Sequence, residues 1–338
     1  MNKISLYLQE HITGEIITNT SARNFYSTDA SIFKIQPNVI IYPKNESDVR
    51  KTVKFSYQLA KNRRIFPITA RGSGTDQSGA AIGPGLILVF PAHFNKLLEL
   101  NGKVGQVRVE PGLNFGKLQQ TLLTHDFFLP CAPASLEYST IGGALANNAA
   151  GDRSVKYGPI LDYVESLRVV LSNGDIIVTK RLSKRELNKK LGLSNYEGEI
   201  YRAVDKLIDD NTQTIHESEI NTARNASGYN LHLVKRKDGS FDLTPLIVGS
   251  QGTLGVITEA TLATIPRRPK TTLTVALIDD LDLLDKLLVE LKKSSETPSA
   301  IEMVDDNLLN LVRKTHPNLI KDLFSEHSPK FVLLIEFD

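Results

Sequence analysis

The stretch TARGSGTDQSGAA (residues 69–81) places three glycines, four hydroxyl residues, one arginine and one aspartate in thirteen positions, between two apolar segments. Gly72, Gly74 and Gly79 let the backbone approach an anion closely, and successive amides in such a turn form an anion-binding nest. No Gly-Lys-Ser/Thr follows, which excludes a Walker A loop, and Gln77 breaks the pattern G-x-G-x-x-G. The spacing alone does not distinguish a phosphate-binding loop from an ordinary Gly/Ser-rich surface loop.

Length and composition bound the class of protein. The 338 residues suggest two domains, and 41% hydrophobic with 23% charged residues is an ordinary globular composition. A net charge of +2 without a basic stripe argues against a nucleic-acid partner. Cys131 is the single cysteine, so an intrachain disulfide and a cysteine zinc site are excluded. We expect no signal peptide, no transmembrane segment and a cytoplasmic location, with peripheral attachment to the inner membrane left open.

Periodicity predicts alternating strands and helices. We expect helices at 47–61, 114–125 and within 183–210, and strands at 63–69, 85–90 and 104–110. Pro67 makes the strand at 63–69 unlikely to be central in a sheet. Asn173-Gly174 predicts a hairpin over 163–180. Residues 246–265 suggest a strand, a glycine-rich turn and a second strand or helix start, and 271–338 follow the order β-α-β-α-β after a linker with Pro266 and Pro269.

Two further stretches are rich in small residues. STIGGALANNAAG (residues 139–151) suits a backbone lying against a flat ligand, with Asn147 and Asn148 able to bond a polar edge, or simply a tightly packed helix start. GSQGTLGVITEATL (residues 249–262) suits a ligand-binding turn or an ordinary hairpin. Each stretch alone is weak evidence for a site.

Together, and in this order, the three stretches resemble the FAD-contacting signatures of the vanillyl-alcohol oxidase superfamily, the FAD-linked oxidases with a PCMH-type FAD-binding domain. Within it they are most similar to the glycolate oxidase subunit and D-lactate dehydrogenase branch. FYSTDAS, VIIYPKNESDV, VEPGLNFGKLQQ and ARNASGYNL support the resemblance, which covers roughly residues 25–265 and continues more weakly to the end.

The resemblance implies an α+β fold: a PCMH-type FAD-binding domain of two α/β subdomains, followed by a partial ferredoxin-like α+β cap domain. We expect an N-terminal extension at 1–35, the FAD-binding domain at 36–265, and the first part of a substrate domain at 270–338, apparently truncated.

The resemblance also implies the cofactor site. The FAD pyrophosphate is expected on the first loop. The second stretch is expected to contact the pyrophosphate, the ribityl chain or the flavin ring, and the backbone of the third to lie at the adenine end. The implied cofactor-binding residues are Arg71, Gly72, Ser73, Gly74, Thr75, Asp76, Gln77, Ser78, Glu110, Pro111, Ser139, Thr140, Gly142, Gly143, Asn148, Gly151, Tyr157, Gly158, Val256 and Ile257. Because the first loop has no histidine and Cys131 is expected to be buried, FAD is expected to be noncovalent.

The implied activity is a dehydrogenase that oxidises a D-2-hydroxy acid such as D-lactate or glycolate and passes electrons to a quinone, a cytochrome or an iron–sulfur protein. Such a reaction needs a flavin N5 to accept a hydride, a base and a carboxylate-binding cation. In the resembled branch the base and a divalent metal come from a histidine-rich motif, H-x-x-G-D-G-N-x-H, that this chain lacks. The catalytic residues therefore stay unknown and no metal ligands are assigned. Seven histidines are scattered at His11, His93, His125, His216, His232, His316 and His327, and only His232 is considered near the flavin.

Two alternatives remain. One keeps the fold with another alcohol substrate, such as an aldonolactone or an alkyl-ether phosphate. The other is an FAD-binding subunit or fragment without its own catalytic residues, completed by a partner or a missing C-terminal segment. On its own the chain is expected to bind FAD with little or no turnover.

Overall fold

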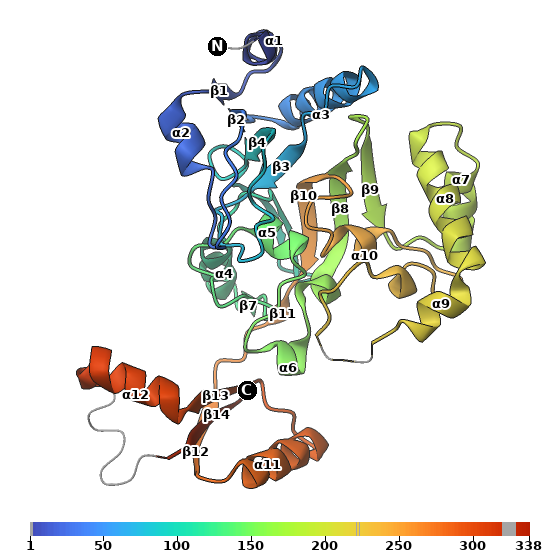
Figure 1. The fold of residues 1–338 in the computed structure, drawn as a ribbon. Coiled ribbons are helices and arrows are strands. Elements are labelled where there is room, and N and C mark those ends of the chain that lie inside the picture. The colour runs from blue at the N-terminus through green and yellow to red at the C-terminus, as the bar shows by residue number, and fades with distance from the viewer. Residues whose placement is uncertain (1–2, 221, 223, 320–328) are drawn as a thin grey trace.

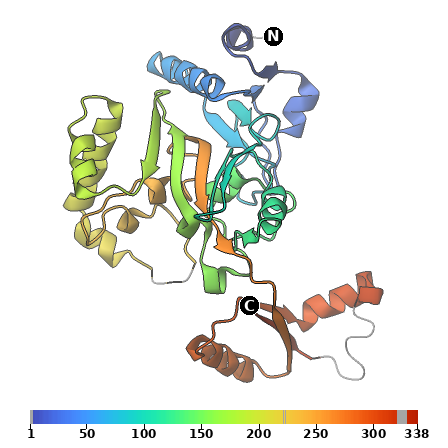
Figure 2. The same cartoon turned by 180° about the vertical axis from the view of Figure 1, so that it is seen from behind.

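The computed structural model describes residues 3–220, 222, 224–319 and 329–338 (Figures 1 and 2). Two sheets lie side by side in the larger part of the molecule, and a smaller three-stranded sheet with two helices follows at the C-terminal end. This mixed α+β architecture agrees with the fold class predicted from the sequence. No helix in these ranges is both long and apolar enough to cross a membrane.

The first sheet has the strand order β1-β2-β4-β3. Its strands are β1 (Glu15–Ile17), β2 (Val39–Tyr42), β4 (Leu86–Val89) and β3 (Ile68–Arg71). β2, β4 and β3 are parallel, whereas β1 from the N-terminal segment pairs antiparallel with β2. β3 lies at the edge, as predicted, but it begins at Ile68 rather than at residue 63, so Pro67 precedes the strand instead of lying within it.

Helix α3 (Glu46–Lys61) connects β2 to β3 and confirms the helix expected at 47–61. Its N-cap Asn45 accepts a hydrogen bond from the amide of Asp48, which satisfies one of the free donors of the first turn. Val49 and Val53 are buried against the sheet. Helices α1 (Lys3–His11) and α2 (Thr20–Phe25) precede this unit.

The second sheet is antiparallel throughout, with the order β5-β6-β10-β8-β9. Its strands are β5 (Leu97–Asn101), β6 (Gln106–Val109), β10 (Val256–Ala263), β8 (Val164–Val170) and β9 (Ile176–Lys180). β8 and β9 form the predicted hairpin, and Gly174 in its turn has φ +86°, a conformation that glycine adopts without strain. Helices α4 (Phe115–Leu123), α7 (Lys184–Leu191), α8 (Tyr196–Asp210) and α9 (Thr212–Glu217) pack around this sheet.

Another element differs from the prediction in type. The strand expected to begin at Leu246 is instead a buried helical turn, α10 (Thr244–Ile247). A short apolar run cannot be assigned to strand or helix by periodicity alone. Here Pro245 lies in the first turn, and the carboxylate of Asp242 accepts the amide of Thr244, both typical of a helix start. The segment after the glycine-rich turn is the strand β10.

The C-terminal part has the predicted order β-α-β-α-β. It contains β12 (Thr272–Ile278), α11 (Leu281–Lys293), β13 (Ala300–Asp305), α12 (Asp306–Thr315) and β14 (Phe331–Phe337). β14 lies between β12 and β13 and is antiparallel to both, the split β-α-β arrangement of ferredoxin-like folds. Leu284, Leu287 and Leu291 of α11 pack on one face of this sheet.

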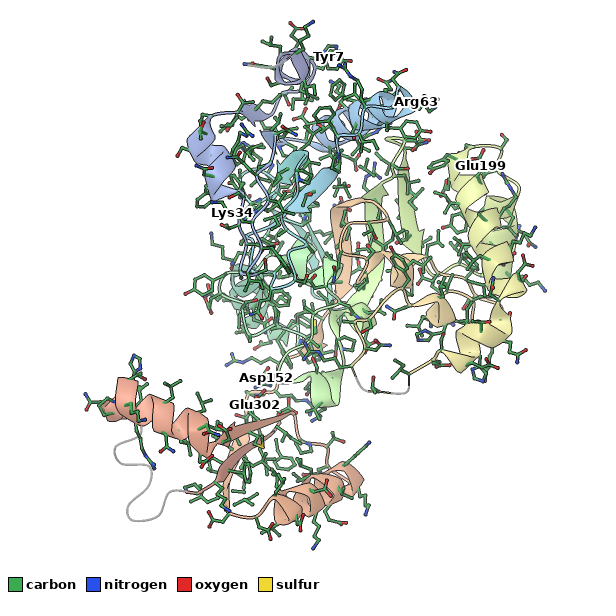
Figure 3. All side chains as sticks on the ribbon, in the orientation of Figure 1. Tyr7, Lys34, Arg63, Asp152, Glu199 and Glu302 are labelled. Carbon is green, nitrogen blue, oxygen red and sulfur yellow. The ribbon has the colours of Figure 1, made fainter. Side chains whose placement is uncertain are left out.

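The C-terminal sheet contacts the larger part at α6 (Ser154–Tyr157). Arg153 pairs with Glu336, and Lys156 pairs with Asp338 at 2.5 Å. Figure 3 shows Asp152 and Glu302 on the two sides of this junction. The remaining elements are α5 (Ile141–Ala146), the two-residue strands β7 (Phe127–Phe128) and β11 (Ile265–Pro266), which pair, and the 3-10 turns η1 (Ile160–Tyr163), η2 (Leu231–Leu233) and η3 (Pro317–Leu319).

Candidate functional site

The three small-residue stretches meet at the short helix α5, which is part of the second stretch. Its N-cap Thr140 accepts a hydrogen bond from the amide of Gly143 through Oγ1, at 3.3 Å. A Cβ on Gly142 would lie 2.7 Å from Cβ of Pro111, so a larger residue there would force the segments apart. The small residues thus begin a tightly packed helix, and they also leave space beside it.

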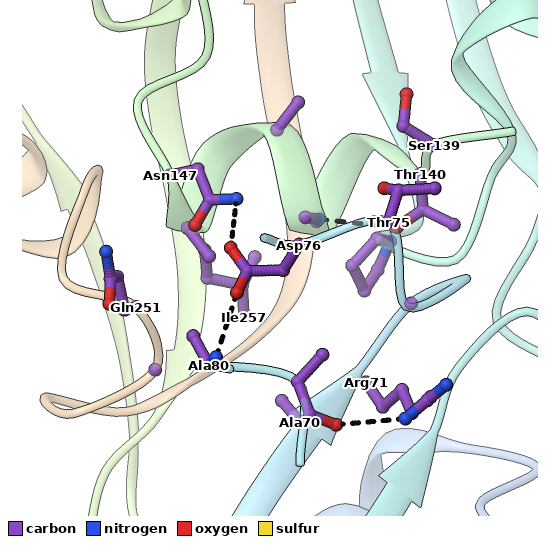
Figure 4. Close-up of a pocket in the computed structure, with 18 of the residues that line it drawn as sticks. Ala70, Arg71, Thr75, Asp76, Ala80, Ser139, Thr140, Asn147, Gln251 and Ile257 are labelled. Carbon is purple, nitrogen blue, oxygen red and sulfur yellow. Dashed lines mark hydrogen bonds between the residues drawn. The ribbon is translucent and has the colours of Figure 1, made fainter. Parts of the chain in front are cut away.

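The first loop leaves the end of β3 and lies against the N-terminal end of α5. A Cβ on Gly72 would come within 2.2 Å of Oγ1 of Thr140. Farther along the loop, Asp76 accepts a hydrogen bond from the side-chain amide of Asn147, the C-cap of α5, at 3.0 Å (Figure 4). The loop therefore spans the helix from one end to the other.

The third stretch reaches the same helix through its backbone. The amide of Gly249 donates to the carbonyl of Leu145, and the amide of Gln251 to that of Ala146, both at 2.9 Å. These carbonyls lie in the last turn of α5, where the regular intrahelical hydrogen bonds end, and that of Leu145 also accepts the amide of Asn148 at 3.2 Å. Gly249, Gln251 and Gly252 have φ of +81°, +52° and +77°, so the turn is built from left-handed residues.

A pocket opens between the three stretches, with about 1030 Å³ of free space including its opening to solvent. Many of the residues predicted for the cofactor site line it together. They are Arg71, Gly72, Ser73, Gly74, Thr75, Asp76, Pro111, Ser139, Thr140, Gly142, Gly143 and Ile257. The structure thus brings residues from distant parts of the chain to one cavity.

Other predicted residues lie outside the lining, and most of them have structural partners. Ser78 donates its hydroxyl to Asp76, next to the exposed Gln77. Glu110 accepts the amide of Lys96 at 2.9 Å. Val256 instead lines a neighbouring pocket of about 690 Å³ between α3 and the turn at 252–255.

The end of the second stretch also turns away from the pocket. The amide of Asn148 donates to the carbonyl of Asn225, and its oxygen accepts the amide of Leu161, each at 3.3 Å. Gly151 packs on the carbonyl of Ala132, which a Cβ would approach to 1.8 Å. Tyr157 donates its hydroxyl to Asp338 at 2.6 Å, and Gly158, with φ +75°, packs beside Asp162.

Several lining residues were not predicted as site residues. They are Ala70, Ala80, Ala81, Phe90, Pro133, Ser135, Ala144, Ala146, Asn147, Ala149, Ile247, Ser250, Gln251, Gly252 and Gly255. The glycine cluster was a usable signal for the turn at 250–252. Asn147 was indistinguishable from Asn148 by sequence. Phe90 and Ile247 carry no local signal, because only the tertiary fold turns them toward the cavity.

Arg71 is 5% exposed and supports the loop from within. Its Nη1 donates to the carbonyls of Thr28 at 2.8 Å and Ala81 at 3.3 Å, and its guanidinium lies 5.1 Å from the ring centre of Tyr26. Burial lowers the pKa of Arg71 from its very high ordinary value. Its Nε and the buried Oγ of Ser139 have no partner among the described residues, although both residues line the pocket. Two buried donors of lining residues are therefore left without a protein acceptor in the described ranges.

The charge of Asp76 is held within the loop. Burial alone would raise the pKa of this carboxyl group, but hydrogen bonds from Ser78, Ala80 and Asn147 outweigh it and keep the pKa below its usual range. Asp76 is therefore ionised at neutral pH. By contrast, the backbone amides of Ser73, Gly74 and Thr75 have no acceptor within the described part of the chain.

The chemistry of the lining fits a dinucleotide bound without a covalent bond. Open amides and hydroxyls suit a diphosphate, and Phe90, Ile247 and Ile257 offer apolar surface for a ring. Among the residues that the structure describes, neither a histidine nor a cysteine lines the pocket. Cys131 is fully buried, and burial raises the pKa of its thiol far above its ordinary value.

The six histidines in the described ranges do not line the pocket; His232 lies in η2, and His327 falls outside the described residues. The described residues contain no group of three His, Cys, Asp or Glu side chains placed to hold a metal. The titratable side chains of the lining are Arg71 and Asp76, and both are engaged in the loop.

Comparisons with known proteins agree with this geometry. Residues 37–180 match a family described as FAD binding domain. D-2-hydroxyglutarate dehydrogenase of Escherichia coli is 34% identical over 90% of this chain, which corresponds to 30% of the relative. The glycolate oxidase subunit GlcD of Bacillus subtilis is 28% identical over 95% of this chain and 56% of its own length. The chain thus spans between about a third and about half of these curated relatives.

A solved structure shares the fold. An alkyldihydroxyacetonephosphate synthase superposes on the whole of this chain and on 56% of its own, with a TM-score of 0.68 and 18% sequence identity. At this identity the likeness concerns architecture alone.

Proposed function

Because residues 37–180 match an FAD binding domain and similar proteins include D-2-hydroxyglutarate dehydrogenase and GlcD, we propose that the chain is an FAD-linked oxidase with a PCMH-type FAD-binding domain and acts in the oxidation of a D-2-hydroxy acid. When bound, the flavin supplies a hydride acceptor at its N5 position. The observation that carries the proposal is the single pocket built from three separate sequence stretches. The substrate class is inferred from the names of the relatives.

We place the FAD diphosphate on the first loop. The amides of Ser73, Gly74 and Thr75 are free to donate there, and Ser139 offers its unpaired hydroxyl from the second stretch. The neighbouring Ile257 and the turn at 250–252 close the opposite side. In this placement the chain's own residues bind and orient the cofactor through hydrogen bonds and apolar contact.

The reaction is tested by substrate reduction of the bound flavin. Protein loaded with FAD is mixed without oxygen with D-2-hydroxyglutarate, D-lactate or glycolate, and the flavin absorbance at about 450 nm is followed. We expect one of these acids to bleach the band, and the L enantiomers of the chiral acids to leave it unchanged. Dithionite serves as the control that the flavin can be reduced. Bleaching by dithionite but by none of the acids would contradict an active dehydrogenase.

A second function is favoured by the composition of the lining. Among the described residues of the pocket there is no histidine, lysine, glutamate or tyrosine to act as a base, and Asp76 is held by the loop. We therefore also propose an FAD-binding subunit whose catalytic residues come from elsewhere. The same assay separates the two: FAD binding with no reduction by any acid supports the subunit, and direct reduction by an acid contradicts it.

The electron acceptor is proposed by class. A flavin reduced by a hydroxy acid must be reoxidised, and a quinone, a cytochrome or an iron–sulfur protein can accept its electrons. A quinone analogue and oxidised cytochrome c, each added to substrate-reduced protein, provide the test. Faster recovery of the flavin absorbance with one of them than with oxygen identifies the class.

We also propose that residues 36–265 form the FAD-binding domain and residues 270–338 belong to a substrate domain. The segment between them carries Arg267, Arg268 and Lys270 and is exposed. Brief trypsin treatment is expected to cut there first and to leave a large fragment that retains FAD. Cutting first within 36–265 would contradict this division.

A further inference from the structure

We propose that Asp76 is a positioning residue: with Asn147, its carboxylate holds the first loop in the conformation in which Ser73, Gly74 and Thr75 present their amides to the FAD diphosphate. The proposal rests on the placement of the diphosphate given above and on FAD binding. It does not depend on which substrate is oxidised. It concerns an acidic residue in a loop that receives an anion, where a carboxylate is unexpected.

The contacts of Asp76 account for the shape of the loop. Oδ2 accepts the amide of Ser78 at 2.9 Å, the hydroxyl of Ser78 at 2.7 Å and the amide of Ala80 at 2.9 Å. Oδ1 accepts Nδ2 of Asn147 at 3.0 Å. One oxygen therefore folds the second half of the loop around itself, and the other joins the loop to the end of α5.

The arrangement separates two sets of donors. The amides of Ser78 and Ala80 are consumed by the carboxylate, whereas those of Ser73, Gly74 and Thr75 find no acceptor in the described part of the chain. The negative charge of Asp76 is balanced by four hydrogen bonds, which also depress its pKa. A loop held in this way does not have to be ordered when the ligand binds, and such preorganisation raises affinity.

Asn147 couples this loop to the rest of the pocket. It is the C-cap of α5, next to the carbonyls of Leu145 and Ala146 that accept the amides of the third stretch. The hydrogen bond from Asn147 to Asp76 thus links the first loop to the helix that the third stretch also contacts. Loss of this bond should loosen the loop without removing a pocket wall.

The opposing explanation predicts a change of opposite sign. If Asp76 were only a negative charge near the diphosphate, removing it would strengthen FAD binding, because like charges repel. If Asp76 positions the loop, removing it weakens FAD binding although the pocket becomes less negative. The sign of the change in affinity therefore decides between the two.

The first experiment measures the Kd for FAD of Asp76→Ala by quenching of flavin fluorescence. We expect a Kd at least about 10-fold higher than that of the wild type, because the substitution removes the charge-assisted hydrogen bonds that Asp76 accepts. Asp175→Ala is the matched control, because Asp175 also accepts a hydrogen bond from an asparagine, Asn173, at 2.7 Å, but in the exposed β8–β9 turn. We expect the control to keep the wild-type Kd. Tighter or unchanged binding by Asp76→Ala would overturn the proposal.

The second experiment asks for rescue. Asn147→Asp places two carboxylates side by side and is expected to weaken FAD binding about 10-fold or more. The double variant Asp76→Asn with Asn147→Asp restores a hydrogen bond between an amide and a carboxylate. Its Kd for FAD should return to within about 3-fold of the wild-type value. Asp76→Asn alone should not bind FAD more tightly than the wild type. A double variant as weak as Asn147→Asp, or tighter binding by Asp76→Asn, would contradict the proposal. The double variant keeps one carboxylate and one amide at this contact. It therefore still tests the proposal if Asp76→Ala does not fold.

Failure of the underlying placement gives a different pattern. Gly143 lines the pocket, and a Cβ on it would meet only Oγ1 of Thr140, at 3.4 Å, so a leucine there extends into the open space. If Gly143→Leu does not affect FAD binding, the cofactor placement is wrong. If Gly143→Leu abolishes binding while Asp76→Ala leaves it unchanged, the placement holds and the role of Asp76 is wrong.

Discussion

The first loop (residues 71–80) and the turn of the third stretch (residues 249–255) lie at the same helix but are held in different ways. The first loop is fixed by charged side chains: Arg71 donates to backbone carbonyls behind it, and Asp76 gathers donors within it. The turn is fixed by its backbone, through left-handed residues and amides that donate to α5. The first loop should therefore depend on ionisation and on single side chains, and the turn on the absence of Cβ atoms.

Arg71→Ala is expected to have the largest effect, because it removes the buried support of the first loop. The substitution leaves the carbonyls of Thr28 and Ala81 without their donor and empties the space beside Tyr26. We expect the free energy of unfolding to fall by about 2–4 kcal/mol, measured by urea denaturation of the protein without FAD. Arg23→Ala is a suitable control, since this less buried arginine also donates to a backbone carbonyl, that of Pro37. A loss for Arg71→Ala no larger than for the control would contradict the support role.

Gly249→Ala tests the turn and is expected to have an intermediate effect. Its φ of +81° disfavours any residue with a Cβ, and that atom would lie 3.3 Å from Cβ of Asn148. We expect a loss of about 1–2 kcal/mol in the free energy of unfolding. Gly192→Ala is the matched control: Gly192 has φ −79° and room for a Cβ, so no loss is expected. Equal losses at the two positions would show that the backbone conformation of the turn is not what matters.

Acid should destabilise the first loop, by a smaller amount than the two substitutions above. The folded pKa of Asp76 is depressed, so its contribution to stability is present above the unfolded value of about 4 and is lost as the pH falls through the lower folded value. The variant Asp76→Asn has no carboxylate at this position, so it does not lose this contribution to stability as the pH falls. We expect the unfolding free energy of the variant to decline less steeply below about pH 4 than that of the wild type, and the two curves to run parallel above about pH 5. Identical slopes in acid would show that Asp76 is not stabilised as a carboxylate.

Local chemistry made part of this site predictable. Glycines and hydroxyl residues in residues 69–81 mark a loop whose backbone must come close to another group, and the structure places that loop against Thr140. The apolar run at 85–90, the cap at Asn45 and the Asn173-Gly174 turn specify their elements by short-range rules. These features do not depend on distant partners, so the sequence alone is sufficient to predict them.

Features that depend on distant partners could not be predicted. Arg71 was expected on the diphosphate, yet its Nη1 is held by Thr28, which lies 43 positions earlier in the chain. Asn147 rather than Asn148 lines the pocket, because Asn148 adopts φ +47° after the helix and turns its amide toward Asn225. Phe90 follows the end of β4, and Ile247 is the last residue of α10. Both line the pocket only because the tertiary fold brings these two ends together.

The most direct test of the pocket is a titration of FAD into the wild-type chain and into Gly143→Leu, with flavin fluorescence and thermal unfolding recorded on the same samples. Leucine favours a helix more than glycine does, so the variant without FAD should unfold at the wild-type temperature or above it. The account predicts saturable binding of FAD by the wild type, a rise in its unfolding temperature, and loss of both effects in the variant. A variant that folds and binds FAD with the wild-type Kd would contradict the claim that the three stretches around α5 form the FAD site.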